Sequence, residues 1–168
     1  MIERAEYLDM LNRFKDKDLI KVVTGIRRCG KSTLFKEFIN YLKETGVKEN
    51  QIIDINLEDA MYDFQNYKEL YDFINKQINN QTKFYVFLDE VQNVPEFQKA
   101  VDSLYIKENV DVYITGSNAF LLSGELATLL SGRYIEIKML PLSFKEYLTA
   151  FKDKNKSKYE YFEDYMKN

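Results

Sequence analysis

The stretch that decides the fold runs over residues 19–33 and reads LIKVVTGIRRCGKST. Its first part is short, apolar and β-branched, which is typical of a strand, and Gly25 ends it. The segment from Gly25 to Ser32 fits the pattern G-x-x-x-x-G-K-[ST], and the apolar spacing over residues 34–42 predicts a helix directly afterwards. A strand, a glycine-containing turn and a helix in this order predict a loop that binds phosphate through backbone N–H groups at the helix N-terminus.

The residue types in this loop suit the phosphates of a nucleotide. Two glycines allow the backbone to bend around the β-phosphate, Lys31 would bridge the β- and γ-phosphates, and the Ser32 hydroxyl would ligate Mg²⁺. The structural alternative is a turn with a capping Ser, in which the loop arginines face solvent and the cysteine only fills space. The candidate nucleotide-binding residues of the loop are Gly25, Arg28, Cys29, Gly30, Lys31, Ser32 and Thr33.

A second apolar run, residues 84–88, ends in the acidic pair Asp89 and Glu90. A phosphate loop needs a carboxylate at the tip of a neighbouring strand to hold the metal, which suits Asp89, and Glu90 could polarise an attacking water as the catalytic base. A water-activating carboxylate favours hydrolysis over transfer to a small-molecule hydroxyl. The alternative interpretation is a strand that leads into an ordinary polar turn.

Two further segments carry candidate site residues. Residues 115–118, Thr-Gly-Ser-Asn, end another apolar run, so that Ser117 or Asn118 could contact the γ-phosphate, although either could equally cap a helix. Arg133 follows Gly132 and could stabilise the transferred phosphoryl group, in cis or in trans. A surface arginine after a helix-ending glycine explains Arg133 equally well.

Strands alternate with helices along the chain, which predicts parallel strands buried between two helical layers. We expect an α/β, three-layer P-loop fold with a parallel five-stranded sheet, in which the strand before the phosphate loop is central. The strand bearing Thr115 should lie between it and the strand bearing Asp89. Strands are expected at 19–24, 51–56, 84–88, 110–115 and 134–137, and helices at 3–15, 34–42, 67–78, 97–105 and 119–130, with another starting at Ser143. Residues 1–151 form one expected domain, and 152–168 are expected to be a solvated, lysine-rich linker and the start of a further C-terminal region.

The composition excludes several classes of function. The 168 residues contain no His and one Cys, so imidazole catalysis, zinc clusters and internal disulfides are excluded, and a cytoplasmic location is expected. The net charge of −3 argues against a domain that grips nucleic acid unaided. A membrane protein is not expected, because the apolar runs are far shorter than the roughly 20 residues that span a bilayer.

Five motifs together resemble one family. They are residues 24–33 (TGIRRCGKST), 88–92 (LDEVQ), 114–118 (ITGSN), 130–133 (LSGR) and 141–144 (PLSF). In their order and spacing, over nearly the whole chain, the sequence resembles bacterial and archaeal AAA-plus-like ATPases whose P-loop domain precedes a nuclease-like C-terminal domain.

The resemblance implies ATP and Mg²⁺ as ligands, with Lys31 and Ser32 at the phosphates and metal, Asp89 and Glu90 at metal and water, and Ser117 or Asn118 as γ-phosphate sensor. It also implies a homo-oligomer or a C-terminal domain as partner, with nucleic acid a further candidate through that domain. A GTPase is less well supported because no Asn-Lys-x-Asp segment occurs. The alternative is a nucleotide-gated interaction module with little hydrolysis of its own.

Overall fold

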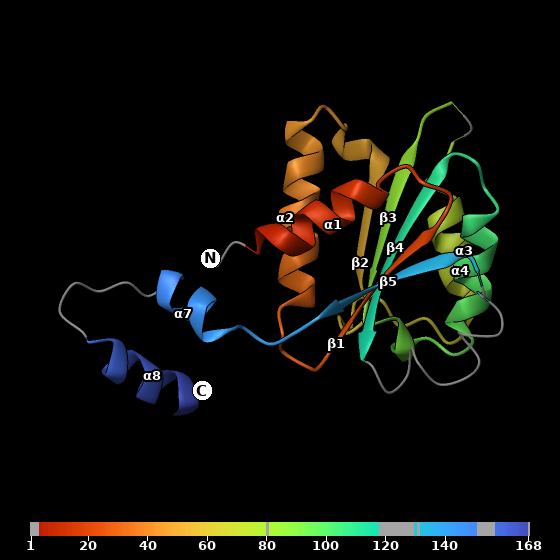
Figure 1. Ribbon diagram of the computed structural model, residues 1–168. Helices are drawn as coiled ribbons and strands as arrows, with labels where there is room; N and C mark the ends of the chain where they lie inside the picture. The colour runs from red at the N-terminus through yellow and green to blue at the C-terminus, as the bar shows by residue number, and fades with distance from the viewer. Residues whose placement is uncertain (1–3, 80, 118–129, 131, 151–156, 168) are drawn as a thin grey trace.

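Helices and strands alternate in the computed structural model, which describes residues 4–79, 81–117, 130, 132–150 and 157–167 (Figure 1). The strands are β1 (Ile20–Gly25), β2 (Ile52–Asn56), β3 (Phe84–Asp89), β4 (Val110–Ser117) and β5 (Tyr134–Met139). The helices are α1 (Ala5–Phe14), α2 (Lys31–Glu44), α3 (Tyr67–Asn75), α4 (Phe97–Tyr105), α7 (Phe144–Ala150) and α8 (Lys158–Lys167). Short 3-10 helices occupy Glu49–Gln51 and Val91–Asn93.

The five strands form one parallel sheet in the order β2-β3-β4-β1-β5. This confirms the three-layer α/β fold and the expected place of the Thr115 strand, β4, between the phosphate-loop strand β1 and the Asp89 strand β3. The expectation that β1 is central was wrong in detail. The strand in the middle of the five is β4, and β1 lies between β4 and the edge strand β5. The helix predicted for 119–130 falls outside the described residues except for Leu130.

Both faces of the sheet are buried, because alternate strand residues point to opposite helical layers. One layer is α1 and α2, and the other is α3 and α4 (Figure 1). On β1, Val23 packs with the α1–α2 side and Val22 with the α3–α4 side. The α1–α2 side is rich in aromatic rings, among them Phe87 of β3 stacked on Tyr113 of β4 with centroids 4.6 Å apart. Two continuous cores therefore hold the sheet rigidly under the loops that follow its strands.

A buried polar network lies where β1 and β4 begin, at the end of the sheet opposite the phosphate loop. The ammonium of Lys21 is fully buried, pairs with Asp111, and donates to the Lys17 carbonyl at 2.9 Å. Asp111 also accepts from the Tyr113 hydroxyl at 2.8 Å and from the Asp16 N–H at 2.9 Å. Burial lowers the pKa of Lys21, and Asp111 opposes that shift. Since every charge here has partners, the network is a structural element rather than a free reactive group.

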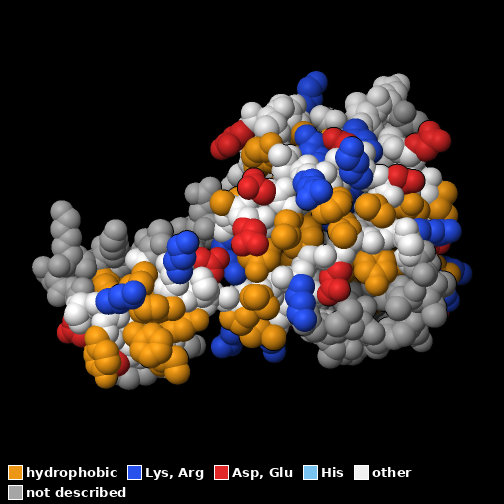
Figure 2. All heavy atoms as spheres, viewed as in Figure 1, with side chains coloured by type: hydrophobic (Ala, Val, Ile, Leu, Met, Phe, Trp, Pro, Cys, Tyr) orange, Lys and Arg blue, Asp and Glu red, His pale blue; other side chains and the backbone are white. Residues whose placement is uncertain are grey.

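The helices α7 and α8 pack on each other beside the main body (Figure 1). Their contact is aromatic, with Phe144 edge-on to Phe162 at 5.2 Å between centroids. Figure 2 shows apolar side chains over this pair, where Tyr159 and Met166 are also exposed. The start of α7 is the predicted capping box. The helix α8 covers residues that we expected to belong to a linker and a further region, and the boundary at 151/152 stays a prediction.

None of the helices that the structure describes combines the length and the apolar character that a bilayer crossing requires.

Candidate functional site

The loop between β1 and α2 needs glycine at two positions for different reasons. A Cβ on Gly25 would lie 2.6 Å from the Cys29 Sγ and 2.6 Å from the Met139 carbonyl oxygen on β5, so β5 leaves no room for a side chain. Gly30 caps α2 with φ of 99°, a conformation that other residues rarely adopt. Arg28 has φ of 66° and an exposed side chain. The backbone therefore turns sharply just before α2, as a phosphate loop requires.

Lys31 lies at the first turn of α2 and is 4% exposed. Its Nζ is 3.2 Å from Oε1 of Glu90, and 3.5 Å and 3.4 Å from the carbonyl oxygens of Gly25 and Ile26. The structure thus brings together the lysine and the acidic pair that the sequence places in separate motifs. In this arrangement Glu90 supplies the negative charge next to the lysine.

The acidic pair at the end of β3 is held by Thr115 of β4. The Thr115 hydroxyl is fully buried, donates to Asp89 Oδ1, and accepts the N–H of Glu90 at 2.9 Å. Glu90 itself has φ of 54°, and its Oε2 accepts from Gln92 Nε2 at 2.6 Å. The buried Gln92 Oε1 has no partner among the described residues. Both oxygens of Glu90 are therefore engaged, one by Lys31 and one by Gln92.

Sequence reasoning missed the roles of Thr115 and Gln92. It treated Thr115 only as part of a polar strand end, although a hydroxyl residue at the end of an otherwise apolar strand was a usable signal. Gln92 belongs to the LDEVQ motif, but a helix-capping or turn role explains a glutamine at that position equally well, so its contact with Glu90 was not predicted.

The oxygen ligands beside the loop fit a Mg²⁺ ion that retains most of its water ligands. Asp89 supplies a carboxylate that is 5% exposed, and Ser32 supplies an exposed hydroxyl at the start of α2. Mg²⁺ is usually held by one or two carboxylates together with substrate phosphates and water, so these two groups suffice. Among the described residues no three acidic or cysteine side chains gather into a cage made by the protein alone.

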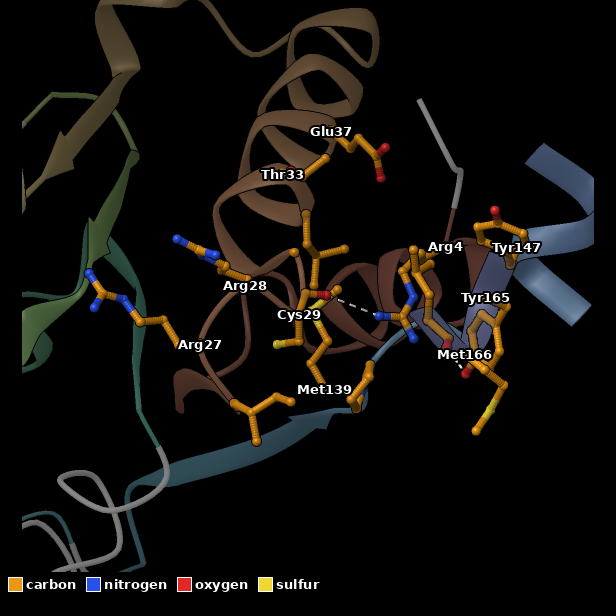
Figure 3. Close-up of a pocket in the computed structure, with 15 residues that line it drawn as sticks. Arg4, Arg27, Arg28, Cys29, Thr33, Glu37, Met139, Tyr147, Tyr165 and Met166 are labelled. Carbon is orange, nitrogen blue, oxygen red and sulfur yellow. Dashed lines mark hydrogen bonds between the residues drawn. The ribbon is translucent and has the colours of Figure 1, made fainter. Parts of the chain in front are cut away.

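A cavity of about 990 Å³ opens next to the loop. Its walls come from the loop itself, from Thr33 on α2, from Met139 on β5, and from Tyr147 and Tyr165 on α7 and α8. Figure 3 shows the two tyrosines on one side of this space, while Arg27 extends away on the other side. Cavities of this size, mostly apolar with a few polar groups, are typical of small-molecule sites. Cys29 is buried in the wall and Arg28 lies at its edge.

The remaining predicted residues separate in space. Ser117 is the register partner of Gly25, so it lies at the same edge of the sheet as the loop. Asn118 lies outside the described residues. Arg133 precedes β5 and is next to Ile20, at the other end of β1, about five strand residues or roughly 16 Å from Gly25. There its Nη1 lies 2.6 Å from Asp102 Oδ1, so the structure does not bring Arg133 to the loop of its own chain.

Comparison with known proteins identifies relatives of the chain. A family model described as an AAA domain matches residues 17–148. An uncharacterised protein of Haemophilus influenzae is 49% identical over 154 residues, which are 89% of this chain and 38% of that protein. The uncharacterised protein MJ1544 of Methanocaldococcus jannaschii is 34% identical over 162 residues, which are 94% of this chain and 35% of that protein. The chain thus spans less than two fifths of the length of either relative.

Solved structures share the fold at low sequence identity. Saccharomyces cerevisiae RIF2 superposes with a TM-score of 0.58 and 16% identity, covering 95% of this chain and 67% of that chain. Drosophila ORC bound to AT-rich DNA and Cdc6 gives 0.54 and 15%, covering 91% and 59%. C. elegans PCH-2 gives 0.53 and 18%, covering 83% and 42%. These similarities establish the architecture of the domain.

Proposed function

The chain belongs to the AAA domain family, and from that premise we propose that it binds ATP with Mg²⁺ and hydrolyses it. One observation carries the proposal. The loop turns at Gly30 into α2 and leaves Lys31 buried against Glu90 of the acidic pair, while residues 26–30 of the same loop line a cavity of nucleotide size whose walls do not include Lys31 or the acidic pair. A buried ammonium, a helix N-terminus and adjacent carboxylates form a site for a polyphosphate and its metal.

Each residue has a proposed role. Backbone N–H groups of the loop and the ammonium of Lys31 bind the β- and γ-phosphates. Ser32 and Asp89 would hold Mg²⁺, which when bound neutralises charge on the phosphates. Thr115 keeps Asp89 in place through its hydroxyl. Glu90 orients and polarises the attacking water once its carboxylate is free to accept the proton.

A second candidate follows from the state of Glu90. Because Lys31 engages one of its oxygens and Gln92 the other, the carboxylate in this arrangement is held by two protein donors instead of being directed at a water. This favours the alternative of a nucleotide-gated interaction module that binds ATP but hydrolyses it slowly until a partner rearranges the site. The steady-state turnover of the isolated chain at saturating Mg²⁺-ATP distinguishes the two: repeated turnovers support the ATPase, and binding without turnover supports the module.

We further propose that Arg133 acts on the nucleotide of a neighbouring subunit. Its distance from the loop of its own chain supports a role in trans over one in cis, and its ion pair with Asp102 would hold the side chain in position. Mixing tests the proposal, because a Lys31→Ala subunit retains its arginine and an Arg133→Ala subunit retains its loop. Activity regained on mixing, with subunit exchange shown by native mass spectrometry, supports the role in trans. Normal hydrolysis by Arg133→Ala alone contradicts it.

The binding test uses titration calorimetry with Mg²⁺-ADP. Lys31→Ala removes a charge-assisted contact to phosphate and should weaken binding by at least about 1.5 to 3 kcal/mol, or roughly tenfold or more. Lys36→Ala is the matched control, because Lys36 is an exposed lysine of the same helix. Equal affinity of the wild type and Lys31→Ala would refute the assignment of the loop.

Target recognition is proposed to reside in the longer relatives' additional length, beyond the region that this chain spans. Nucleic acid is one candidate target. The ATPase rate of a full-length relative with and without duplex DNA tests this, since unchanged turnover would argue against DNA as the ligand that stimulates it.

A further inference from the structure

Arg4 is a buried arginine that sequence reasoning did not single out. It caps the start of α1, where its carbonyl accepts the N–H of Tyr7 at 3.0 Å, and it is only 7% exposed. A buried guanidinium is costly unless its N–H groups are satisfied. Its partners therefore identify what the residue holds together.

Three separate segments converge on this guanidinium. Nη1 donates to the Leu140 carbonyl at 2.7 Å and to the Cys29 carbonyl at 3.3 Å, and Nε donates to Glu146 Oε1 at 2.9 Å. Its Cζ lies 4.5 Å from the ring centroid of Tyr7. Figure 3 shows Arg4 between the phosphate loop and the side chains of α7 and α8.

The contact with Cys29 fixes a peptide of the phosphate loop. In a planar trans peptide the carbonyl and the following N–H point in opposite directions. Because the Cys29 carbonyl points to Arg4, the N–H of Gly30 points away from it, toward the opposite side of the loop. That N–H is one of the backbone donors proposed to bind phosphate. A change in the position of Arg4 would therefore reorient a phosphate donor.

The other contacts connect Arg4 to the C-terminal helices. Tyr7, one turn further along α1, accepts the N–H of Leu140 through its hydroxyl at 3.1 Å, so α1 holds both polar groups of residue 140. Glu146 closes the capping box of α7, since its Oε2 accepts from the Ser143 N–H and hydroxyl, both at 2.7 Å. The side chain of Arg4 therefore connects the first turn of α7 to the phosphate loop, because its guanidinium hydrogen-bonds to both.

We propose that Arg4 is a positioning residue that couples phosphate binding at the loop to the placement of α7 and α8. The inference rests on the proposed nucleotide-binding function. Phosphate bound at the Gly30 N–H favours the peptide orientation that Arg4 stabilises, and this in turn favours the docked position of Glu146 and α7. By linkage, docking of α7 favours phosphate binding to the same extent.

Hydrogen–deuterium exchange tests the coupling, with Mg²⁺-tripolyphosphate as the probe. Tripolyphosphate has no base or ribose, so it lacks the groups that would pack on the tyrosines of α7 and α8. In the wild type, saturating probe should slow exchange in residues 25–33 and also in 144–150 and 158–167. In Arg4→Lys, which retains the charge but loses the fork of donors, the affinity should fall about tenfold. At saturation the loop should then be protected while the response of α7 and α8 is lost.

Two controls separate coupling from a merely structural role. Arg13→Lys changes the exposed arginine of α1 and should behave as the wild type. Glu146→Gln weakens the connection to α7 and leaves the contact of Arg4 with the loop in place, so it should lose the response of α7 and lower the affinity by no more than the coupling itself contributes. Glu160→Gln makes the same change in the corresponding capping box of α8 and should leave the α7 response intact. A structural role alone would raise exchange in α7 and α8 with and without the probe, yet preserve the response.

The outcomes are distinguishable. A full α7–α8 response in Arg4→Lys or in Glu146→Gln, with the loop protected, overturns the inference alone, as does a wild type whose loop is protected without any response of α7 and α8. A wild type whose loop is not protected by tripolyphosphate or by Mg²⁺-ADP overturns the proposed function and the coupling with it. If Arg4→Lys fails to fold, Glu146→Gln decides by the same criterion.

Discussion

Replacing Glu90 by Gln should increase the affinity for nucleotide while it lowers turnover. From the motif alone one expects unchanged affinity, because the amide keeps the shape of the side chain. The structure alters that expectation, since Lys31 Nζ lies 3.2 Å from Glu90 Oε1 and both side chains are largely buried. Bound phosphate must therefore take the lysine away from a carboxylate before it gains the contact.

The size of the gain follows from the interaction that is exchanged. Hydrogen bonds that involve a charged group contribute about 1.5 to 3 kcal/mol; the contact between two opposite charges lies toward the upper end, and one between the Lys31 ammonium and a neutral amide lies toward the lower end. Loss of the carboxylate charge should thus release roughly 1 to 1.5 kcal/mol, which corresponds to about five- to tenfold tighter binding. Gln92 can adapt to the new amide, because turning its own amide presents the unpartnered Oε1 as an acceptor.

The assay is calorimetry with Mg²⁺-ADP for the wild type, Glu90→Gln and Glu49→Gln, followed by turnover with Mg²⁺-ATP. Glu49→Gln is the control, because it removes the charge of an exposed glutamate whose Oε1 lies 2.8 Å from Lys43 Nζ, outside the phosphate-loop motif. It should change neither the affinity for Mg²⁺-ADP nor the turnover of Mg²⁺-ATP. Affinity of Glu90→Gln equal to or weaker than that of the wild type would refute the competition between carboxylate and phosphate for Lys31. Wild-type turnover by Glu90→Gln would show that another group activates the water.

Three further outcomes are expected. Lys21→Met leaves the charge of Asp111 buried without its partner, so urea unfolding should show a loss of about 3 to 5 kcal/mol, and a loss below about 1 kcal/mol would contradict this account. Thr115→Val removes the hydroxyl that holds the acidic pair and should lower stability by about 1 to 3 kcal/mol and reduce turnover; an unchanged rate would remove Thr115 from the site. Burial opposes the ionisation of Glu146, but hydrogen bonds within its capping box and the guanidinium of Arg4 lower its pKa below 4.5. The unfolded chain therefore binds the proton of Glu146 more readily than the folded chain does. The stability that Glu146 contributes is complete above pH 4.5 and is lost as the pH falls through the lower pKa of the folded state. Between about pH 5 and pH 3 the melting temperature of Glu146→Gln should therefore fall less than that of the wild type.

The fold was predictable because its determinants are local. The apolar β-branched runs, the periodic helices and the glycines that separate them each lie within a short window, and their alternation implies a parallel sheet. The order of β1, β4 and β3 was also correct. The position of β1 relative to the middle of the sheet was not, because it depends on which edge receives β5, and no local pattern records that choice.

The site was predictable to the extent that its residues lie at the carboxyl ends of strands. Lys31, Asp89 and Ser117 were expected at one edge of the sheet, and the register and contacts gather them there. Arg133 was predicted to act in cis or in trans, and it precedes β5, as the expected strand at 134–137 implied. In a parallel sheet a residue before a strand lies at the end opposite to residues that follow strands, so the register separates Arg133 from the loop of its own chain.

Arg4 shows why part of a site leaves no trace in a sequence. Two of its three acceptors are backbone carbonyls, which every residue type supplies. The residue types at positions 29 and 140 therefore do not indicate that these residues contact Arg4. The third, Glu146, has an independent reason to be present as the capping residue of α7. The partners are 25, 136 and 142 residues away, and only the packing of α1 against β5 and α2 brings them together. Residues that act on the backbone of a motif from a distance are therefore found from burial, since a charged side chain excluded from water must have partners worth identifying.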